Sequence, residues 1–371
     1  MPGSIAVWLN GHEFLNERDR LFDASDNRSP AFYYTEPFSV LKEYLSAHGY
    51  ELTTIDKLQG EVADALVIVD LPAQRSTLDH IRKSCPARRH VLIVMESPIG
   101  RAHMFCPRNF REFDAVLTYD SQACDGSTVF HYRLPVLSKT LLMSNALPEA
   151  ASIGFSERRV LAVLNANRYR DWFSWRGSPV TPVFRGWAIC HSTTKKLLVA
   201  DGYEKRRQFI KQADRSLADG LDIYGNGWSG EPKTTWHRFI APRAYSCARG
   251  GWPERSDLLF RRYKFGLAFE NCITNLGYVS EKIFLPMLGG AVPVYLGEEH
   301  ISDYVPASAF IDARRYHSYD ELCETLRDMP EPTWQNIRTE GLKFLRSSGV
   351  QKFTVPQMAE ALLSAFQALK L

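Results

Sequence analysis

The chain has 371 residues, which is more than one ordinary hydrophobic core holds and fits two domains of common size. Hydrophobic residues make up 45% and charged residues 23%, and 45 Lys and Arg against 42 Asp and Glu leave a formal charge of +3. This balance is typical of globular proteins and disfavours a dedicated nucleic-acid binder, which would gather a larger basic excess in one stripe.

Cysteine usage and the N-terminus indicate the compartment. The seven cysteines are scattered and form no close pair of the kind that metal sites use. The first residues, MPGSIAVWLNGHEF, have neither a basic segment nor an apolar run long enough for a signal peptide or a membrane span. We therefore expect a cytoplasmic protein with reduced thiols and leave peripheral association with the inner face of a membrane open.

The N-terminal half alternates between buried strands and amphipathic helices. The predicted parallel strands are 5–9 (IAVWL), 65–70 (ALVIVD) and 90–96 (HVLIVME). Helical patterns follow Pro37 and occupy 76–83, so the alternation predicts an α/β fold. The regularity weakens after Tyr119, and we place a domain boundary near residue 150, with a first domain over 1–150.

The C-terminal half repeats the alternation. The predicted elements are strands at 159–165 (RVLAVLN), 222–227 (DIYGNG), 263–269 (YKFGLAF) and 291–297 (AVPVYLG), with helices at 203–217 and from about Ser280. They predict a second α/β domain over 151–350, followed by an amphipathic helix within 351–371. Residues 168–202 are rich in Trp and Arg without a clear period, which predicts a long loop.

The most informative stretch runs from 263 to 297. A buried strand ends in Phe269-Glu270-Asn271, a polar loop follows, and Ser280-Glu281-Lys282 is expected to open a helix. Open α/β sheets bind ligands beyond the carboxyl ends of their strands, and the N-terminus of a helix offers free N–H groups to a diphosphate. The residues alone leave a second interpretation open, because Glu281 and Lys282 are also ordinary charges at a helix start.

This stretch, FENCITNLGYVSEKIFLPMLGGAVPVYLG, resembles the donor-site signature of the α1,3/4-fucosyltransferases of glycosyltransferase family 10. That signature reads approximately FENS, a short spacer, Y-(I/V)-(T/S)-E-K and later A-(V/I)-P-(V/I)-x-x-G. The following segment at 304–326 is also similar to the family, and the similarity covers roughly 203–346. The resemblance implies a GT-B fold, with two Rossmann-like domains facing across a cleft and GDP-fucose bound by the second.

Carried over position by position, the resemblance implies the donor site. Tyr278, Glu281 and Lys282 would contact the sugar, ribose and phosphates of the GDP-sugar, with Asn271 and Glu270 supporting their loop.

Three further segments add donor residues. GYEKRRQFIKQA (202–213) implies that Arg206 binds phosphate, with Arg207 as the alternative. VLNANRY (163–169) implies that Asn165 and Asn167 line the phosphate pocket, although Asn is also a common turn residue. Tyr224, in DIYGNG, completes the set.

An inverting transfer also needs a base that takes the proton of the acceptor hydroxyl. Met95-Glu96-Ser97-Pro98 resembles the family's Phe-Glu-Ser-Pro, whose Glu is taken as the base, and the segment at 109–135 is similar in the same register. Glu96 is therefore the candidate catalytic base. The rivals beside predicted strand ends are Asp70, Asp120, His12 and Glu13.

We therefore expect an enzyme that transfers fucose from GDP-fucose to an oligosaccharide or glycolipid, such as an N-acetyllactosamine-type or lipopolysaccharide glycan, in α1,3/4 linkage. The residues offered for the acceptor are His12, Glu13, Tyr33 and Tyr34. No cofactor and no metal ligand are expected, because no Asp-x-Asp follows a strand, and stimulation by Mn²⁺ or Mg²⁺ stays open. The alternatives are a GT-B enzyme with another nucleotide sugar and a non-catalytic glycan-binding protein.

Overall fold

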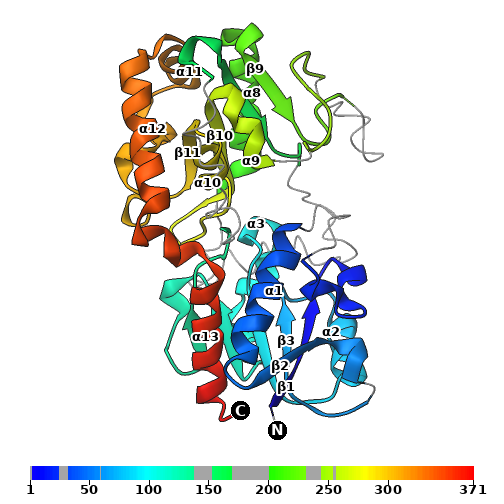
Figure 1. The fold of residues 1–371 in the computed structure, drawn as a ribbon. Helices are drawn as coiled ribbons and strands as arrows, with labels where there is room; N and C mark the ends of the chain where they lie inside the picture. Colours follow the sequence, from blue (N-terminus) through cyan, green and yellow to red (C-terminus); the bar gives the residue numbers. More distant parts are fainter. Residues whose placement is uncertain are drawn as a thin grey trace.

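The computed structural model describes residues 2–24, 32–58, 60–137, 153–168, 200–230, 244–253 and 256–371. Two lobes, each built on a sheet with helices around it, are stacked along the long axis of the molecule (Figure 1). The lower lobe in this view holds the N-terminal strands, and the upper lobe holds the C-terminal ones.

The first lobe contains a six-stranded sheet in the order β2-β1-β3-β4-β5-β6, in which every pairing is parallel. Its strands are β1 (Gly3–Leu9), β2 (Tyr50–Thr54), β3 (Ala63–Val69), β4 (Ala87–Ile93), β5 (Ala115–Thr118) and β6 (Val129–His131). The three central strands carry runs of branched apolar side chains that are buried on both faces, as parallel sheets require. The predicted strands at 5–9 and 65–70 are confirmed.

Helices cover this sheet: α1 (Phe32–Ser46), α2 (Arg75–Ser84), α3 (Pro98–Arg101) and α4 (Pro107–Phe110). The prediction that the first helix follows Pro37 is wrong, because α1 begins at Phe32 and contains Pro37. Proline removes one N–H from the helical ladder, but buried residues lie on both sides of it, with Thr35 and Glu36 before and Phe38, Leu41 and Leu45 after, and this packing stabilises the helix.

The second lobe contains a sheet in the order β12-β11-β10-β7-β9, with β8 paired antiparallel to β10. Its strands are β7 (Arg159–Leu164), β8 (Ala200–Asp201), β9 (Leu221–Tyr224), β10 (Tyr263–Thr274), β11 (Val292–Glu298) and β12 (Ile311–Asp312). Its helices are α8 (Gly202–Ser216), α9 (Ser256–Leu259), α10 (Phe284–Leu288), α11 (Tyr319–Asp328) and α12 (Glu331–Arg346). Two α/β lobes with parallel sheets confirm the predicted fold class.

The last helix, α13 (Val355–Ala368), returns to the first lobe. It packs against α1, β5 and β6, and Figure 1 shows it descending beside the lower sheet, with the two chain ends close together. Its buried face contains Met358, Leu362 and Phe366, as the periodicity predicted. Because α13 follows α12 of the second lobe, it joins the two lobes a second time.

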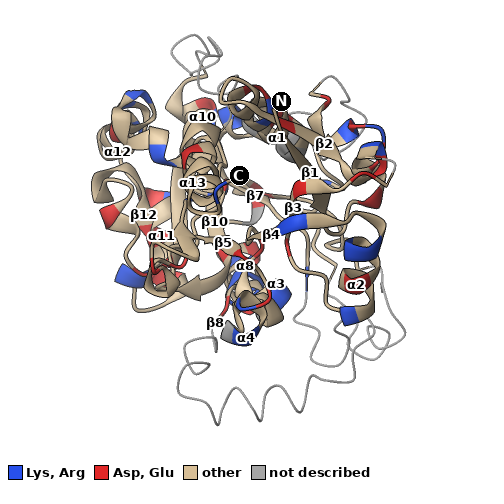
Figure 2. Cartoon of the chain, turned by 90° about the horizontal axis from the view of Figure 1, so that it is seen from below, with Lys and Arg blue, Asp and Glu red and all other residues tan. Residues whose placement is uncertain are grey.

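Two expectations lie outside the described residues. They are the domain boundary near 150, within 138–152, and most of the loop at 168–202. In the part of the chain that is described, basic and acidic residues are interspersed over both lobes (Figure 2).

Candidate active site

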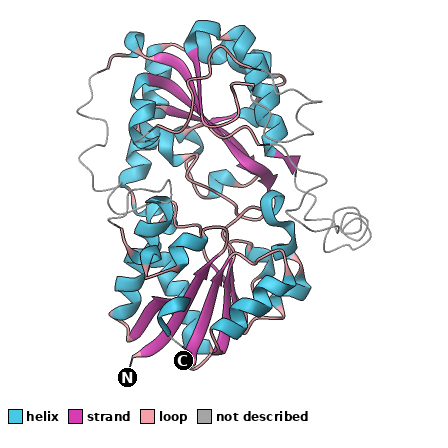
Figure 3. Cartoon of the chain, turned by 90° about the vertical axis from the view of Figure 1, so that its right-hand side faces the viewer, coloured by secondary structure: helices cyan, strands magenta, loops and turns pink. Residues whose placement is uncertain are grey.

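The candidate residues lie where the two sheets approach one another. The strands of the lower lobe point their carboxyl ends toward the upper lobe (Figure 3). The ring of Tyr119, just after β5, lies 5.3 Å from the ring of Tyr278 of the upper lobe. In addition, α3 packs against β10. Parallel α/β sheets bind their ligands at this edge.

The loop after β10 is held by two buried carboxylates. Glu270, which is fully buried on β10, accepts hydrogen bonds from the Ser280 N–H (2.7 Å) and the Ser280 hydroxyl (2.6 Å). Glu298, at the end of β11, accepts from the Gly277 N–H (2.8 Å) and the Thr274 hydroxyl (3.1 Å). The residues between these anchors include Tyr278. We call residues 275–283 the donor loop.

Glu298 was missed by sequence reasoning. The signal was available, since this Glu directly follows the apolar run AVPVYLG at a strand end. Gly297 beside it is required by close approach, because a Cβ there would lie 2.4 Å from the Glu270 Cγ atom.

Lys282 neutralises the carboxylates of Glu270, on β10, and of Glu281, in the donor loop. Its Nζ atom lies 3.6 Å from the Glu270 carboxylate and 3.2 Å from that of Glu281, and it donates to the Ser280 hydroxyl (3.0 Å). Burial alone would lower the pKa of Lys282, but Glu281 and Glu270 raise it above its ordinary value. Burial raises the pKa of Glu270, against the opposing effect of Lys282. The lysine is therefore a cation at neutral pH.

The prediction that Ser280 opens a helix is wrong. Leu285 N–H donates to the Glu281 carbonyl (2.9 Å), but Pro286 has no N–H with which to continue the ladder at Lys282. Regular helix therefore starts only at Phe284, and α10 has five residues. Ser280, Glu281 and Lys282 lie in the turn before it, so we withdraw the expected contribution of a helix N-terminus to diphosphate binding.

The side chain of Arg206 extends from α8 to β10. Its Nη2 atom donates to the Phe269 carbonyl (2.5 Å) and lies 3.4 Å from the Asn271 side-chain oxygen. Burial lowers the pKa of this guanidinium to about 10, so it stays charged at neutral pH. Its Nε atom has no hydrogen-bond partner among the described residues. Arg207, the alternative, instead pairs with Glu204 (2.6 Å).

Gly202, at the start of α8, allows the helix that carries Arg206 to lie close to β10. A Cβ at Gly202 would lie 2.1 Å from the Glu270 carbonyl oxygen, so only glycine allows α8 to start this close to β10.

Asn165 and Asn167 follow β7 and are both buried. The Asn165 carbonyl accepts from the Trp228 indole (2.5 Å), and the Asn167 amide donates to the Gly227 carbonyl (2.9 Å). Within the described chain, the Asn165 Nδ2 and Asn167 Oδ1 atoms have no hydrogen-bond partner. Buried polar atoms of this kind usually have a partner, so they are suited to a polar ligand.

Tyr224 does not join this group. Its hydroxyl is 3.0 Å from that of Tyr263, which donates to the Asp222 carboxylate (2.8 Å). Arg159 and Arg249 pair with the same carboxylate. The side chain of Tyr224 therefore belongs to a network over the sheet, and we no longer place it in the donor site.

On the other lobe, Glu96 lies in the loop after β4, three residues beyond the strand end at Ile93. Its N–H donates to the Asp70 carboxylate (3.0 Å), and its carbonyl accepts from the Tyr119 hydroxyl (2.9 Å). Its carboxylate is partly exposed and lies beside Gly100, where a Cβ would be 3.3 Å from the Oε2 atom.

Two of the rival bases, Asp70 and Asp120, have carboxylates that accept hydrogen bonds from backbone N–H groups. Asp70 is buried and accepts from the N–H groups of both Met95 and Glu96, and burial and the Glu96 charge raise its pKa to about 7. Asp120 accepts from the Gln122 N–H (3.0 Å) in the next turn. Asp70 thus shapes the loop that carries Glu96.

The remaining candidates of this lobe are His12, Glu13, Tyr33 and Tyr34. His12 is half-buried, and burial lowers its pKa against the opposing charges of Glu13 and Glu96. The Glu13 side chain is exposed. Tyr33 and Tyr34 fall in the first turn of α1, and their side chains are outside the described set.

Tyr203 is a second residue that sequence reasoning missed. Burial raises the pKa of its phenol, and the charges of Arg168, Glu96, Arg206 and Lys282 all act on it. The Arg206 guanidinium lies over the Tyr203 ring, with the Cζ atom 5.6 Å from the ring centroid. Its position three residues before Arg206 on one helix was the available signal.

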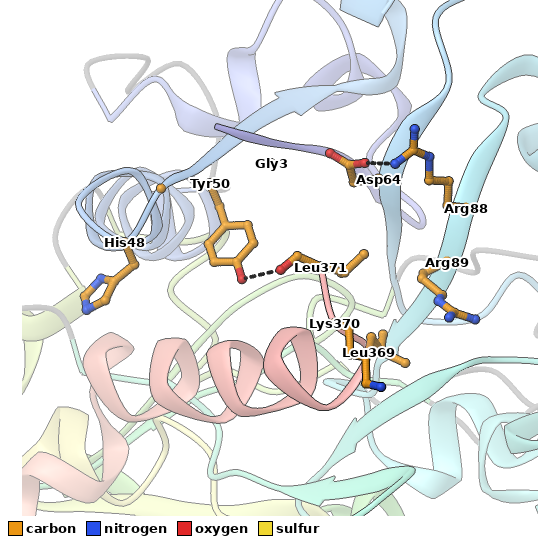
Figure 4. A pocket seen from close by; sticks show the side chains of 10 residues that line it. Gly3, His48, Tyr50, Asp64, Arg88, Arg89, Leu369, Lys370 and Leu371 are labelled. Atoms are coloured by element: carbon orange, nitrogen blue, oxygen red, sulfur yellow. Dashed lines mark hydrogen bonds and ion pairs between the residues drawn. The ribbon is translucent and has the colours of Figure 1, made fainter. Parts of the chain in front are cut away.

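A pocket of about 750 Å³ lies at the opposite end of the first sheet (Figure 4). It is lined at the amino ends of the strands by Gly3, Tyr50, Asp64 and Arg88 and by the end of the chain at Leu371. The Tyr50 hydroxyl donates to the Leu371 carbonyl (3.2 Å), and Arg88 pairs with Asp64 (3.1 Å). The pocket is separate from the candidate site.

Among the helices that the structure describes, none has the length and apolar character needed to cross a bilayer.

Comparison with solved structures identifies the fold. An alpha1,3-fucosyltransferase solved with GDP-fucose superposes with a TM-score of 0.52 at 14% identity, covering 100% of this chain and 91% of that one. The same enzyme type solved with GDP gives 0.51. At this identity the likeness shows the fold, which is GT-B.

Sequence relatives match shorter segments. An Arabidopsis thaliana alpha-(1,4)-fucosyltransferase is 36% identical over 75 residues, which cover 20% of this chain and 18% of that protein. The human 4-galactosyl-N-acetylglucosaminide 3-alpha-L-fucosyltransferase 9 is 41% identical over 68 residues, or 18% of this chain and 19% of the relative. The Drosophila melanogaster alpha-(1,3)-fucosyltransferase C is 27% identical over 158 residues, or 42% and 30%. The match thus spans less than a third of each of these relatives.

A family model matches residues 185–334 and is described as glycosyltransferase family 10 (fucosyltransferase), C-terminal part. This segment contains Arg206, the donor loop and both anchoring glutamates. Through this segment, the chain is similar to the C-terminal part of glycosyltransferase family 10, the fucosyltransferase family, and the chain as a whole has a GT-B fold.

Proposed function

We propose that the chain is an inverting fucosyltransferase that transfers L-fucose from GDP-fucose to a hydroxyl of an acceptor glycan. The observation that carries this proposal is the position of Tyr119, which donates a hydrogen bond to the Glu96 carbonyl (2.9 Å) and whose ring lies 5.3 Å from that of Tyr278 in the donor loop. The segment of Glu96 on one lobe thus meets the loop of the other lobe that contains Lys282. Displacement of a diphosphate by a hydroxyl needs a base on one side and positive charge on the other. The two lobes supply one each.

The C-terminal domain, 151–350, would bind the donor. Arg206 and Lys282 are both charged at neutral pH and would bind the diphosphate. The buried Asn165 and Asn167 offer one donor and one acceptor that the described residues leave unpaired. Asn271, Glu281 and Tyr278 would line the sugar and ribose, while Glu270 holds their loop through Ser280.

In the reaction, the acceptor oxygen attacks the anomeric carbon of fucose from the face opposite the diphosphate. The carboxylate of Glu96 takes the hydroxyl proton, the bond from the anomeric carbon to the phosphate oxygen breaks, and its electrons leave with GDP. Inversion at a β-linked donor gives an α-fucoside. Arg206 and Lys282 would stabilise the leaving group without a metal, and addition of Mn²⁺ or Mg²⁺ to EDTA-treated protein measures any stimulation.

The N-terminal domain, 1–150, would bind the acceptor next to Glu96. The Glu96 charge acts on the pKa of His12, and the exposed ring of Phe14 lies edge-on to the His12 ring, with ring centroids 6.4 Å apart. A polar group and an exposed aromatic face suit a sugar. We propose an N-acetyllactosamine-type or lipopolysaccharide glycan as the acceptor, in α1,3/4 linkage, modified in the cytoplasm at the inner face of a membrane.

The test measures GDP release from several GDP-sugars, with and without acceptor, for the wild-type protein and for Glu96→Gln. We expect acceptor-dependent release from GDP-fucose that the variant loses, and an α-fucoside by NMR of the product. Release from another GDP-sugar alone, a β-fucoside, or no release from GDP-fucose with any acceptor would refute the proposal.

A further inference from the structure

Tyr119 lies between the two lobes and is fully buried. Its hydroxyl donates to the Glu96 carbonyl (2.9 Å), and its ring lies 5.3 Å from that of Tyr278 and 5.7 Å from that of Phe105. One side chain therefore contacts both the segment that carries the proposed base and the donor loop.

The backbone of Tyr119 makes a second contact with the donor loop. Gly277 has a positive φ of 89°, and a Cβ at this position would lie 2.7 Å from the Tyr119 carbonyl oxygen. The Gly277 N–H is held by Glu298 (2.8 Å). Gly277 of the donor loop therefore packs directly on the Tyr119 backbone, with no room for a side chain at position 277. The buried Glu298 carboxylate holds the same residue through its N–H.

Both peptide groups of Glu96 are held by neighbouring strands. Asp70, after β3, accepts the Met95 N–H (2.7 Å) and the Glu96 N–H (3.0 Å). Tyr119, after β5, donates to the Glu96 carbonyl. With both groups fixed, only side-chain torsions remain to move the carboxylate. Burial raises the pKa of the Tyr119 phenol well above its ordinary value, so the hydroxyl keeps the proton that it donates.

We propose that Tyr119 is a positioning residue that couples the donor loop to the base. Its hydroxyl sets the backbone of Glu96, and its ring seats Tyr278, so the loop and the carboxylate take their working positions together. The catalytic part of this inference rests on the proposed function. The coupling itself is a property of the free protein.

Tyr132 provides a matched control. It is equally buried, and its hydroxyl donates to the Val94 carbonyl (2.7 Å), two residues before Glu96 on the same segment. Tyr119→Phe and Tyr132→Phe each remove one buried hydroxyl and leave the ring, so both variants lose a comparable hydrogen bond. They differ in whether the lost bond holds Glu96.

The kinetic test compares these variants by initial rates of GDP release. We expect Tyr119→Phe to lower kcat about tenfold with the KM for GDP-fucose unchanged, and Tyr132→Phe to stay within about twofold of wild type. If Tyr119 only positions the base, the acid limb of the pH dependence of kcat should lie at the same pH in Tyr119→Phe as in wild type, while kcat itself falls. Equal effects of the two variants, or a rise in donor KM alone, would overturn the positioning role.

Hydrogen exchange tests the coupling without turnover. Tyr278→Leu removes the ring contact from the other lobe, and we expect faster exchange of the Met95 and Glu96 amides in this variant. Tyr132→Phe is again the control, and it should leave the exchange of the Glu96 amide within about twofold of wild type, because the bond that it loses is to the peptide group of the Met95 amide. Unchanged exchange in Tyr278→Leu would overturn the coupling. Absence of GDP release by the wild-type protein would overturn the proposed function, while exchange decides the coupling independently.

Discussion

Replacing Lys282 with methionine removes the cation that neutralises the buried Glu270 carboxylate. At 3.6 Å and an effective dielectric constant of about 20, two unit charges attract by about 5 kcal/mol. Glu270 keeps its two hydrogen bonds from Ser280, which offset part of the loss. We therefore expect Lys282→Met to lower the free energy of unfolding by about 3 kcal/mol at pH 8, the lower end of the range for broken buried pairs.

The loss should depend on pH with a defined sign. The pKa of Glu270 in the folded protein is already above its ordinary value of 4.5, and removing Lys282 raises it further. A carboxyl with a raised folded pKa binds more protons in the folded state, so stability falls as pH rises from 4.5 through that folded pKa. The deficit of Lys282→Met should therefore be small near pH 4.5 and largest at pH 8.

The unfolding free energies of wild type and Lys282→Met are measured at each pH by urea unfolding, monitored by tryptophan fluorescence, with two controls. Lys343→Met breaks a surface pair with Glu340 (2.7 Å) and should cost about 0.5 kcal/mol or less. The double variant Glu270→Gln/Lys282→Met keeps an acceptor for Ser280 without the charge and should regain most of the stability. Equal losses at pH 5 and pH 8, or no recovery in the double variant, would refute the electrostatic explanation.

Three more outcomes are expected. Glu96→Gln should lower kcat by about 10²–10⁴-fold with the donor KM within about threefold, because the amide cannot take a proton; initial rates with kcat near wild type would exclude the base role. Asp70→Asn keeps one oxygen for both N–H groups, so its unfolding free energy should rise relative to wild type as pH increases from about 4 to about 7, the window of the raised Asp70 pKa; a constant difference would argue against a titrating Asp70. Gly202→Ala should destabilise by about 2 kcal/mol or more and raise the donor KM, because its Cβ would lie 2.1 Å from the Glu270 carbonyl, whereas Gly341→Ala, at 3.4 Å from Met287, should be neutral or stabilising in thermal unfolding.

Local patterns predicted the elements but not all their limits. The runs at 65–69 and 292–296 are continuous and β-branched, and both are buried parallel strands. Helix starts were less accurate, because α1 extends back through Pro37 under the stabilisation of its buried face. The start of α10 could have been predicted from Pro286, which cannot donate to Lys282.

Some residues of the site could be named from the sequence, and others could not. Lys282 and Arg206 could be named because the segments that contain them, 269–297 and 202–213, resemble the motifs of a known family. Glu298 and Tyr119 could not be assigned a role, since their partners are 21 residues away in one case and 23 in the other. Hydrogen bonds across such separations depend on which strands become neighbours.

The sequence by itself determined two α/β lobes, an amphipathic last helix and the charged groups at strand ends, because these follow from the periodicity of side chains along a short segment. Only the tertiary structure decided that α13 packs on the first lobe, that the Tyr224 hydroxyl contacts that of Tyr263, and that Tyr119 contacts Tyr278. Periodicity identifies which face of an element is buried, but not what covers it. The packing of the two lobes supplies that partner.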